Sequence, residues 1–155
     1  MIRNAVSFTA TFDGLRVAVT PDADQLAHHA REIRAAWERA FGADLPTHPG
    51  ALLYLTKYFT PHPPGEPHVF VKPAALLETS PSVSTLLDGI CGPGYDVLRG
   101  VVRTDCFHAT PAVFQLWHPG RSIQIPRGAP LVELFPCPRS LIDADISRTT
   151  GGVTW

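Results

Sequence analysis

The sequence is short of charged residues, and above all of lysine. Aspartate, glutamate, lysine and arginine make up 17% of its 155 residues, against about 25% in an average globular protein. Only Lys57 and Lys72 are lysines, and the formal net charge is −1. A chain so close to neutrality gives no basis for predicting binding to nucleic acid or to an anionic membrane.

Cysteine is also scarce, and its positions form no motif. There are three cysteines, an odd number, and no two of them form a CxxC motif: Cys91, Cys106 and Cys137. No disulfide or zinc framework is therefore indicated. No hydrophobic run approaches the 18 or so residues of a membrane-spanning helix, and no charged-then-apolar leader opens the chain. We therefore expect a cytoplasmic protein in which Cys91 and Cys137 behave as small hydrophobic residues.

Several catalytic motifs are missing. There is no GxSxG segment of the kind that carries a nucleophilic serine, and no Walker or GxGxxG loop. The segment GRSIQIPRG (120–128) fits the start of the second cupin motif, but Leu131 occupies the position of the metal ligand and no HxH segment exists. The segment therefore indicates only a turn that enters a strand.

Proline, by contrast, is abundant. The 16 prolines, together with the low charge, favour many short strands bounded by turns over a helical bundle. A length of 155 residues predicts a single domain, 1–155, with a core of its own. Within it we expect a hairpin plus helix at 1–49 and a β-barrel portion at 50–155. The predicted class is α+β, mainly β.

A β-hairpin is predicted at the N-terminus. In the segment AVSFTATF every second residue from Val6 to Phe12 is hydrophobic, which is the period of a strand with one buried face. Asp13-Gly14 is typical of a two-residue type I′ turn. The return strand would then continue through Val17 and Val19.

One amphipathic helix is predicted after the hairpin. Thr20 can cap it, Pro21 suits its first position and Gly42 ends it. His28 and His29 are adjacent, so their side chains point about 100° apart and form a poor metal pair. Hydrophobic residues at spacings of three and four form one stripe: Leu26, Ala30, Ile33, Trp37 and Phe41.

From residue 50 onward the pattern is that of short strands. Two segments rich in proline and glycine, TPHPPGEP (60–67) and GICGPGYD (89–96), read as loops. The remaining hydrophobic segments predict strands at 52–59, 68–71, 97–104, 112–118, 122–125 and 130–135.

The order of motifs in residues 81–155 carries a resemblance. The matched features are a hairpin that holds a nucleoside, a turn before a later strand, and a glycine-rich C-terminal arm. Their positions in this chain are Gly100-Val101-Val102, Asp105, Ile125, Gly128, Arg148, Gly151 and Gly152. In this order the chain resembles the dUTPase and dCTP-deaminase superfamily. The resemblance implies a small β-clip barrel, a homotrimer and sites built between subunits.

Four departures from that family concern its reaction. Arg103 stands where the family keeps the aspartate that activates water, and a guanidinium cannot act as a general base. The segment 81–84 (PSVS) lacks the phosphate-binding arginine, Val153 replaces a base-stacking phenylalanine, and Cys106 replaces a tyrosine under the sugar. The scaffold is therefore expected to be kept and dUTP hydrolysis to be lost.

A ligand pocket around Arg103 and Asp105 is the main functional prediction. If 97–104 is a strand that continues in the same pleat, these two side chains share one face, and the resemblance implies that this face lines a pocket. The expected pocket residues are Arg103, Asp105, His108, Trp117 and Glu133. Arg121 and Cys106 complete the candidate ligand-binding residues. The other interpretation of Arg103 and Asp105 is an ion pair, within one chain or between subunits.

The roles follow from the side-chain chemistry. Arg103 would bind an anionic group, Asp105 or Glu133 would act as acid or base, and His108 would carry protons. This predicts a cofactor-independent enzyme that cyclises, isomerises or hydrolyses a small molecule in a specialised metabolic pathway. Glu133 has a second interpretation, as the ion-pair partner of Arg103 or Arg121.

Two other hypotheses stay open. One is a module that binds a nucleotide or metabolite without turnover. The other is a metal enzyme, because histidine is a common metal ligand. Its ligands would be drawn from His62, His68, His108 and His118.

Overall fold

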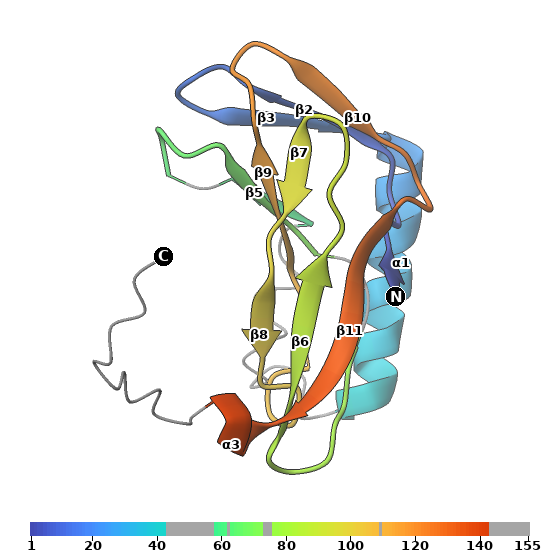
Figure 1. Cartoon of the computed structure of the whole chain (residues 1–155). Helices are drawn as coiled ribbons and strands as arrows, with labels where there is room; N and C mark the ends of the chain where they lie inside the picture. Colours follow the sequence, from blue (N-terminus) through green and yellow to red (C-terminus); the bar gives the residue numbers. More distant parts are fainter. Residues whose placement is uncertain (43–57, 62, 73–75, 109, 143–155) are drawn as a thin grey trace, which may run out of the picture.

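The computed structural model describes residues 1–42, 58–61, 63–72, 76–108 and 110–142. Within these ranges the chain is mainly β, as predicted, with one long helix (Figure 1). The first sheet has the order β1 (Ile2–Arg3), β11 (Pro130–Pro138), β6 (Val83–Gly89) and β8 (Gly100–Val102). The second has the order β10 (Ser122–Ile125), β2 (Phe8–Phe12) and β3 (Val17–Pro21). The third has the order β4 (Phe59–Pro61), β5 (His68–Val71), β9 (Ala112–Leu116) and β7 (Tyr95–Val97).

All the pairings between these strands are antiparallel. The described strands form three sheets and do not close into a barrel. No helix in these ranges is both long and apolar enough to cross a membrane.

The N-terminal hairpin is present, but its turn differs from the prediction. Phe12 pairs with Val17, so four residues and not two connect β2 to β3. The Asp13 carboxylate accepts hydrogen bonds from the backbone N–H groups of Leu15 and Arg16, each at 2.7 Å. Aspartate closes turns in this way by replacing a backbone acceptor, and Gly14 supplies the positive φ of 98° that the longer turn needs.

Helix α1 (Ala23–Phe41) begins two residues later than predicted. Asp22, not Thr20, is the N-cap, and its side chain accepts from the Gln25 N–H at 3.0 Å. Aspartate is among the best residues for this position. At the other end Gly42 has a φ of 49°, and its N–H donates to the Glu38 carbonyl. The predicted end at Gly42 is confirmed.

The buried stripe of α1 is also close to the prediction. Ile33 and Trp37 are buried and pack with Phe41, Tyr58, Leu76 and Phe107. The helix buries His29 where the pattern placed Ala30, which is exposed. Ala30 was predicted to be buried because it is hydrophobic. The His29 imidazole is buried instead, because it is large enough to contact Tyr58, with ring centroids 5.0 Å apart.

The main core lies between the three sheets. It is built from alternate residues of β2, β5, β9 and β10, as expected for strands with one buried face, and from the adjacent residues Leu131 and Val132 of β11. Phe114 is fully buried, with its ring 5.6 Å from that of Phe8 and 5.3 Å from that of Tyr95. A Phe–Phe pair and a Tyr–Phe pair at this spacing stabilise the contact beyond the area they bury.

Several predicted strands have other limits. The strand predicted at 97–104 is two strands, β7 and β8, which belong to different sheets and are joined by Leu98 and Arg99. β9 ends at Leu116, whereas β11 continues to Pro138. The segment PSVS leads into strand β6, although the resembled family opens a helix there. Residues 52–57 of another predicted strand lie outside the described ranges.

Candidate functional site

The residues of the predicted pocket are spread over the molecule. The turn at 103–106 lies at one end of the chain's long axis, beyond β8, and the connection at 117–121 lies at the other, between β9 and β10 (Figure 1). Trp117, His118 and Arg121 are exposed at that second end. The described ranges therefore do not bring the predicted set together within one chain. His62, Arg148, Gly151, Gly152 and Val153 lie outside those ranges.

Arg103 and Asp105 do not share a strand face. β8 ends at Val102, and Thr104–Cys106 form a turn. The Arg103 carbonyl accepts from the N–H groups of Cys106 and Phe107, so the backbone curls at the point where the prediction assumed an extended chain. The side chain of Arg103 is exposed.

Asp105 forms an ion pair with Arg139 instead. Arg139 is the first residue of α3 (Arg139–Ile142), and its guanidinium donates to the Asp105 carboxylate. The backbone N–H of Ser82 donates to the same oxygen at 3.2 Å, and Ser82 has a positive φ of 67°, which is unusual for a residue with a side chain. The Asp105 side chain is only 10% exposed. Burial alone would raise its pKa, but the two hydrogen bonds outweigh burial, and the pKa is lowered.

These contacts give Asp105 a fixed, ionised carboxylate that joins the 103–106 turn to α3. Neighbouring Thr104 is fully buried, and its hydroxyl contacts those of Thr79 and Thr85 at 2.8 and 2.9 Å. Cys106 is exposed, with its sulfur 3.6 Å from the Arg103 carbonyl. The turn is therefore anchored on two sides, which indicates a structural role for Asp105.

Trp117 and Glu133 lie on the outer surface. The Trp117 indole donates to Asp96 at 2.9 Å, and Asp96 also accepts from Cys91, which raises the pKa of that thiol. Glu133 on β11 is exposed and directly opposite Asp88 on β6. Asp88 is bound to Arg99 at 2.8 Å. Neither of the ion pairs predicted for Glu133, with Arg103 or Arg121, is among the contacts of the described residues.

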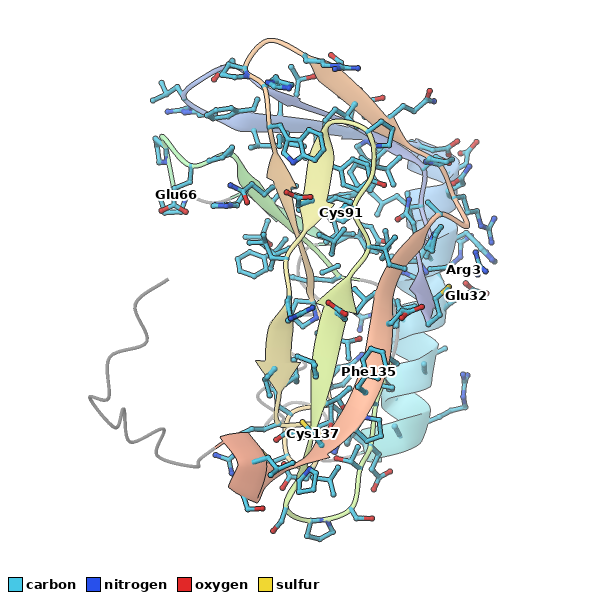
Figure 2. All side chains as sticks on the ribbon, in the orientation of Figure 1. Arg3, Glu32, Glu66, Cys91, Phe135 and Cys137 are labelled. Atoms are coloured by element: carbon cyan, nitrogen blue, oxygen red, sulfur yellow. The ribbon has the colours of Figure 1, made fainter. Side chains whose placement is uncertain are left out.

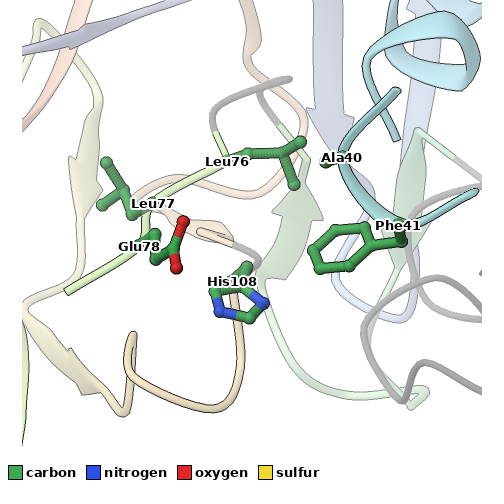
Figure 3. Close-up of a pocket in the computed structure, with 6 residues that line it drawn as sticks. All are labelled: Ala40, Phe41, Leu76, Leu77, Glu78 and His108. Carbon is green, nitrogen blue, oxygen red and sulfur yellow. The ribbon is translucent and has the colours of Figure 1, made fainter. Parts of the chain in front are cut away.

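His108, one of the predicted catalytic residues, lines a cavity. We call this the His108 cavity; its volume is about 300 Å³. Its walls are Ala40, Phe41, Leu76, Leu77, Glu78 and His108. In Figure 3 the Glu78 carboxylate and the His108 imidazole lie on one side of it, with the Phe41 ring facing the imidazole. The space thus combines one carboxylate and one imidazole with hydrophobic walls.

Three separate segments build this cavity. Phe41 is the last residue of α1, and its ring centroid lies 5.3 Å from that of His108 with an interplanar angle of 32°. The backbone N–H of Leu77 donates to the His108 carbonyl at 3.0 Å, which fixes the segment before β6 beside the segment after the 103–106 turn. The contact thus holds Glu78, the next residue along, beside His108.

Glu78 was missed by sequence reasoning. It lies in LLETS, between a hydrophobic pair and polar residues, and nothing in that pattern marks it as functional. A search of the sequence for a carboxylate that could pair with His108 would have included Glu78 among the candidates. It could not have selected Glu78, because the two segments meet only in the folded chain.

The described residues offer no group of three histidine, cysteine, aspartate or glutamate side chains arranged to hold a metal ion. His68 lies 3.4 Å from Glu66, in the third sheet and the loop before it. His118 lies beside Trp117 at the end of β9. These histidines and His108 do not converge within the described ranges.

His29, considered from the sequence only as half of a poor metal pair, is a second titratable group with a distinct environment. Burial lowers its pKa below the ordinary value of 6.5. Among the charged neighbours, Glu32 opposes this change, whereas Arg127 and His28 add to it. A neutral imidazole is therefore favoured in the folded chain.

This gives a pH dependence of stability. Well above pH 6.5 the ring is neutral in both states. As the pH falls through 6.5, the unfolded chain takes up a proton that the folded chain resists, so the free energy of unfolding falls. We expect the melting temperature to drop between about pH 7 and about pH 5, and His29→Leu to flatten that drop. Thermal melts across this range measure it, with His118→Asn as the exposed-histidine control. Equal pH slopes for the wild type and His29→Leu would contradict the assignment.

Comparison of the chain with protein-family models, with characterised proteins and with solved structures found no match.

Proposed function

We propose that the protein binds a small organic molecule in the His108 cavity and transforms it by proton transfer. The observation that carries this proposal is the presence of the His108 imidazole and the Glu78 carboxylate on one hydrophobic cavity of about 300 Å³. A volume of this size is at the lower end of the range for ligand pockets, which are mostly apolar with a few polar groups. The ligand is accordingly a small, largely apolar molecule.

The two polar groups have complementary roles. Imidazole exchanges protons near neutral pH, which makes His108 the acid or base. Glu78 is placed to orient the substrate or the imidazole through its carboxylate. In an isomerisation His108 removes a proton from one substrate atom and returns it to another, so the reaction balances without a cofactor. Phe41, Leu76 and Leu77 supply the hydrophobic part of the wall that would hold the apolar part of the substrate.

This proposal keeps one of the predicted catalytic residues and replaces two. His108 retains the proton-carrying role, and Glu78 takes the place that the sequence suggested for Asp105 or Glu133. Asp105 is bound to Arg139, and Glu133 is exposed on β11. The three reaction types predicted from the sequence, and a place in a specialised cytoplasmic pathway, remain proposals for this site.

We also propose that the scaffold is related to the β-clip barrels. In support, Gly100-Val101-Val102 forms β8 and leads into the turn that holds Asp105, in the order of the family's hairpin. The Ile125–Gly128 segment connects β10 to β11, as the family's later turn does. The His108 cavity would then be a site distinct from the one used for dUTP hydrolysis.

Native mass spectrometry of untagged protein tests occupancy of the cavity. We expect a small-molecule mass on the wild type and its loss in Ala40→Trp, because Ala40 lines the cavity and an indole would fill it. Ala27→Trp is the matched control, since Ala27 is exposed on the same helix and outside the cavity. An extra mass that survives Ala40→Trp would place the ligand elsewhere. Binding without turnover in any assay would favour the metabolite-binding module.

A further inference from the structure

One face of the first sheet carries exposed hydrophobic side chains. Antiparallel strands place directly paired residues on the same face. Phe135 on β11 pairs with Leu86 on β6, and Leu86 pairs with Val101 on β8. Phe135 and Val101 are each 46% exposed, and Figure 2 labels Phe135 at β11. These three residues form an apolar row across the sheet.

The opposite face of the same strands belongs to the core. Leu87 is buried there, and Leu134 and Val102 pack against the buried cluster. The apolar row therefore lies on the outer face of β11, β6 and β8, where a sheet of a monomeric protein normally carries polar residues. Exposed hydrophobic residues grouped in this way mark an interaction surface.

The charged residues beside the apolar row differ in sign between β11 and the start of β8. Next to Phe135 along β11 is Glu133, opposite Asp88 on β6. Asp88 in turn binds Arg99, just before β8, through the Arg99 Nε at 2.8 Å. On this face the β11 side thus carries the carboxylate of Glu133, and the β8 side carries the guanidinium of Arg99. Glu133 and Arg103 have no ion-pair partner among the residues that the structure describes.

We propose that this face binds a second copy of the same chain, related by a two-fold axis that runs along β6. A rotation of 180° about that axis lays the face of one copy on the same face of the other and exchanges the sides on which β11 and β8 lie. β11 of one copy then lies over β8 of its partner, at the same level along the strands. Phe135 meets Val101 and Glu133 meets Arg99, and each of these contacts occurs twice. Leu86 and Asp88 lie on the axis, so each meets its own equivalent once, and each Asp88 stays paired with Arg99 of its own chain.

The charges favour a second copy over an unrelated partner. Arg99 uses its Nε for Asp88, so its two terminal nitrogens remain placed for a carboxylate in the fork geometry that arginine prefers. Glu133 of the other copy supplies that carboxylate. The face is therefore complementary to itself, as an isologous interface must be. The proposed pair has two-fold symmetry, whereas the resemblance implied a three-fold assembly.

Light scattering during size-exclusion chromatography tests the pairing. We expect the wild type to have twice the 16.8 kDa mass of one chain. Glu133→Arg alone and Arg99→Glu alone should each give monomers, because each places like charges opposite one another in both contacts. Mixing the two monomeric variants should restore a dimer, because every reversed charge then faces an opposite one. A three-fold ring has an odd number of contacts and could not be restored in this way.

Two further variants complete the test. Phe135→Ser should also give a monomer with an unchanged far-UV circular dichroism spectrum, since the side chain is half exposed. Arg121→Glu, on an exposed residue of the β9–β10 connection, should leave the dimer intact. A monomeric or trimeric wild type, or folded single variants whose mass equals that of the wild type, would overturn the proposal. The proposal would also be overturned if Glu133→Arg and Arg99→Glu, each monomeric alone, formed no dimer when mixed.

Discussion

Gly89→Ala is expected to abolish stable folding of the chain. Gly89 is the last residue of β6, where the backbone passes close to the end of β7. A methyl group at Gly89 would lie 1.7 Å from the Val97 carbonyl oxygen and 2.4 Å from its carbon. Both are backbone atoms, so no side-chain rotation can relieve the clash. β6 would have to separate from β7 or from its partner β11, to which Gly89 is paired through Val132.

Gly100→Ala is the matched control. Gly100 lies on β8 in the same sheet, and a methyl group there would have no described atom within 4 Å apart from those of Gly100 and its two chain neighbours. We expect its stability to stay within about 1 kcal/mol of the wild type. Soluble expression and a thermal melt of the two variants measure the contrast. Cooperative melting of Gly89→Ala near the wild-type temperature would show that the close approach of β6 and β7 is wrong.

Elements set by local patterns could be predicted from the sequence. The helix follows from the spacing of Ile33, Trp37 and Phe41 and from Gly42 at its end. The strands at 68–71 and 122–125 follow from alternation between turn residues, and the structure has both within the predicted limits. The mainly β class is confirmed for the same reason, since many short alternating segments leave few other arrangements.

The candidate site could not be predicted in the same way. The pairing of Arg103 with Asp105 assumed an extended chain, but β8 ends at Val102, before either residue. Asp105 finds its partner 34 positions away, at Arg139. Glu78 and His108 meet because Leu77 bonds to the His108 backbone. Contacts between distant segments leave no periodic signal, so only His108 was recognised in advance.

In the structure, the relation of the scaffold to β-clip proteins and the position of the candidate pocket are separate questions. The motif order suggested both a β-clip barrel and a pocket at the hairpin after Gly100. In the described ranges the hairpin residues form an anchored turn, and the cavity lies beside the end of α1. The relation to β-clip proteins can therefore hold or fail without affecting the proposal for the His108 cavity.

His108→Asn is expected to lower turnover of the natural substrate by at least about 100-fold, the usual contribution of a general acid or base. Asparagine is similar in size and keeps the backbone carbonyl that accepts from Leu77, so the cavity and the fold should remain. Glu78→Gln should reduce turnover as well, because the amide carries no charge. His118→Asn, at an exposed histidine of the β9–β10 connection, is the control and should leave turnover unchanged.

The most direct test is to incubate the protein with a small-molecule extract of its own host and to follow the extract by liquid chromatography and mass spectrometry. The account predicts that wild type and His118→Asn consume at least one compound and form a product of equal mass or one differing by a water, whereas His108→Asn does not. A compound transformed equally by His108→Asn, or an extract that no variant changes, would contradict proton-transfer catalysis in the His108 cavity.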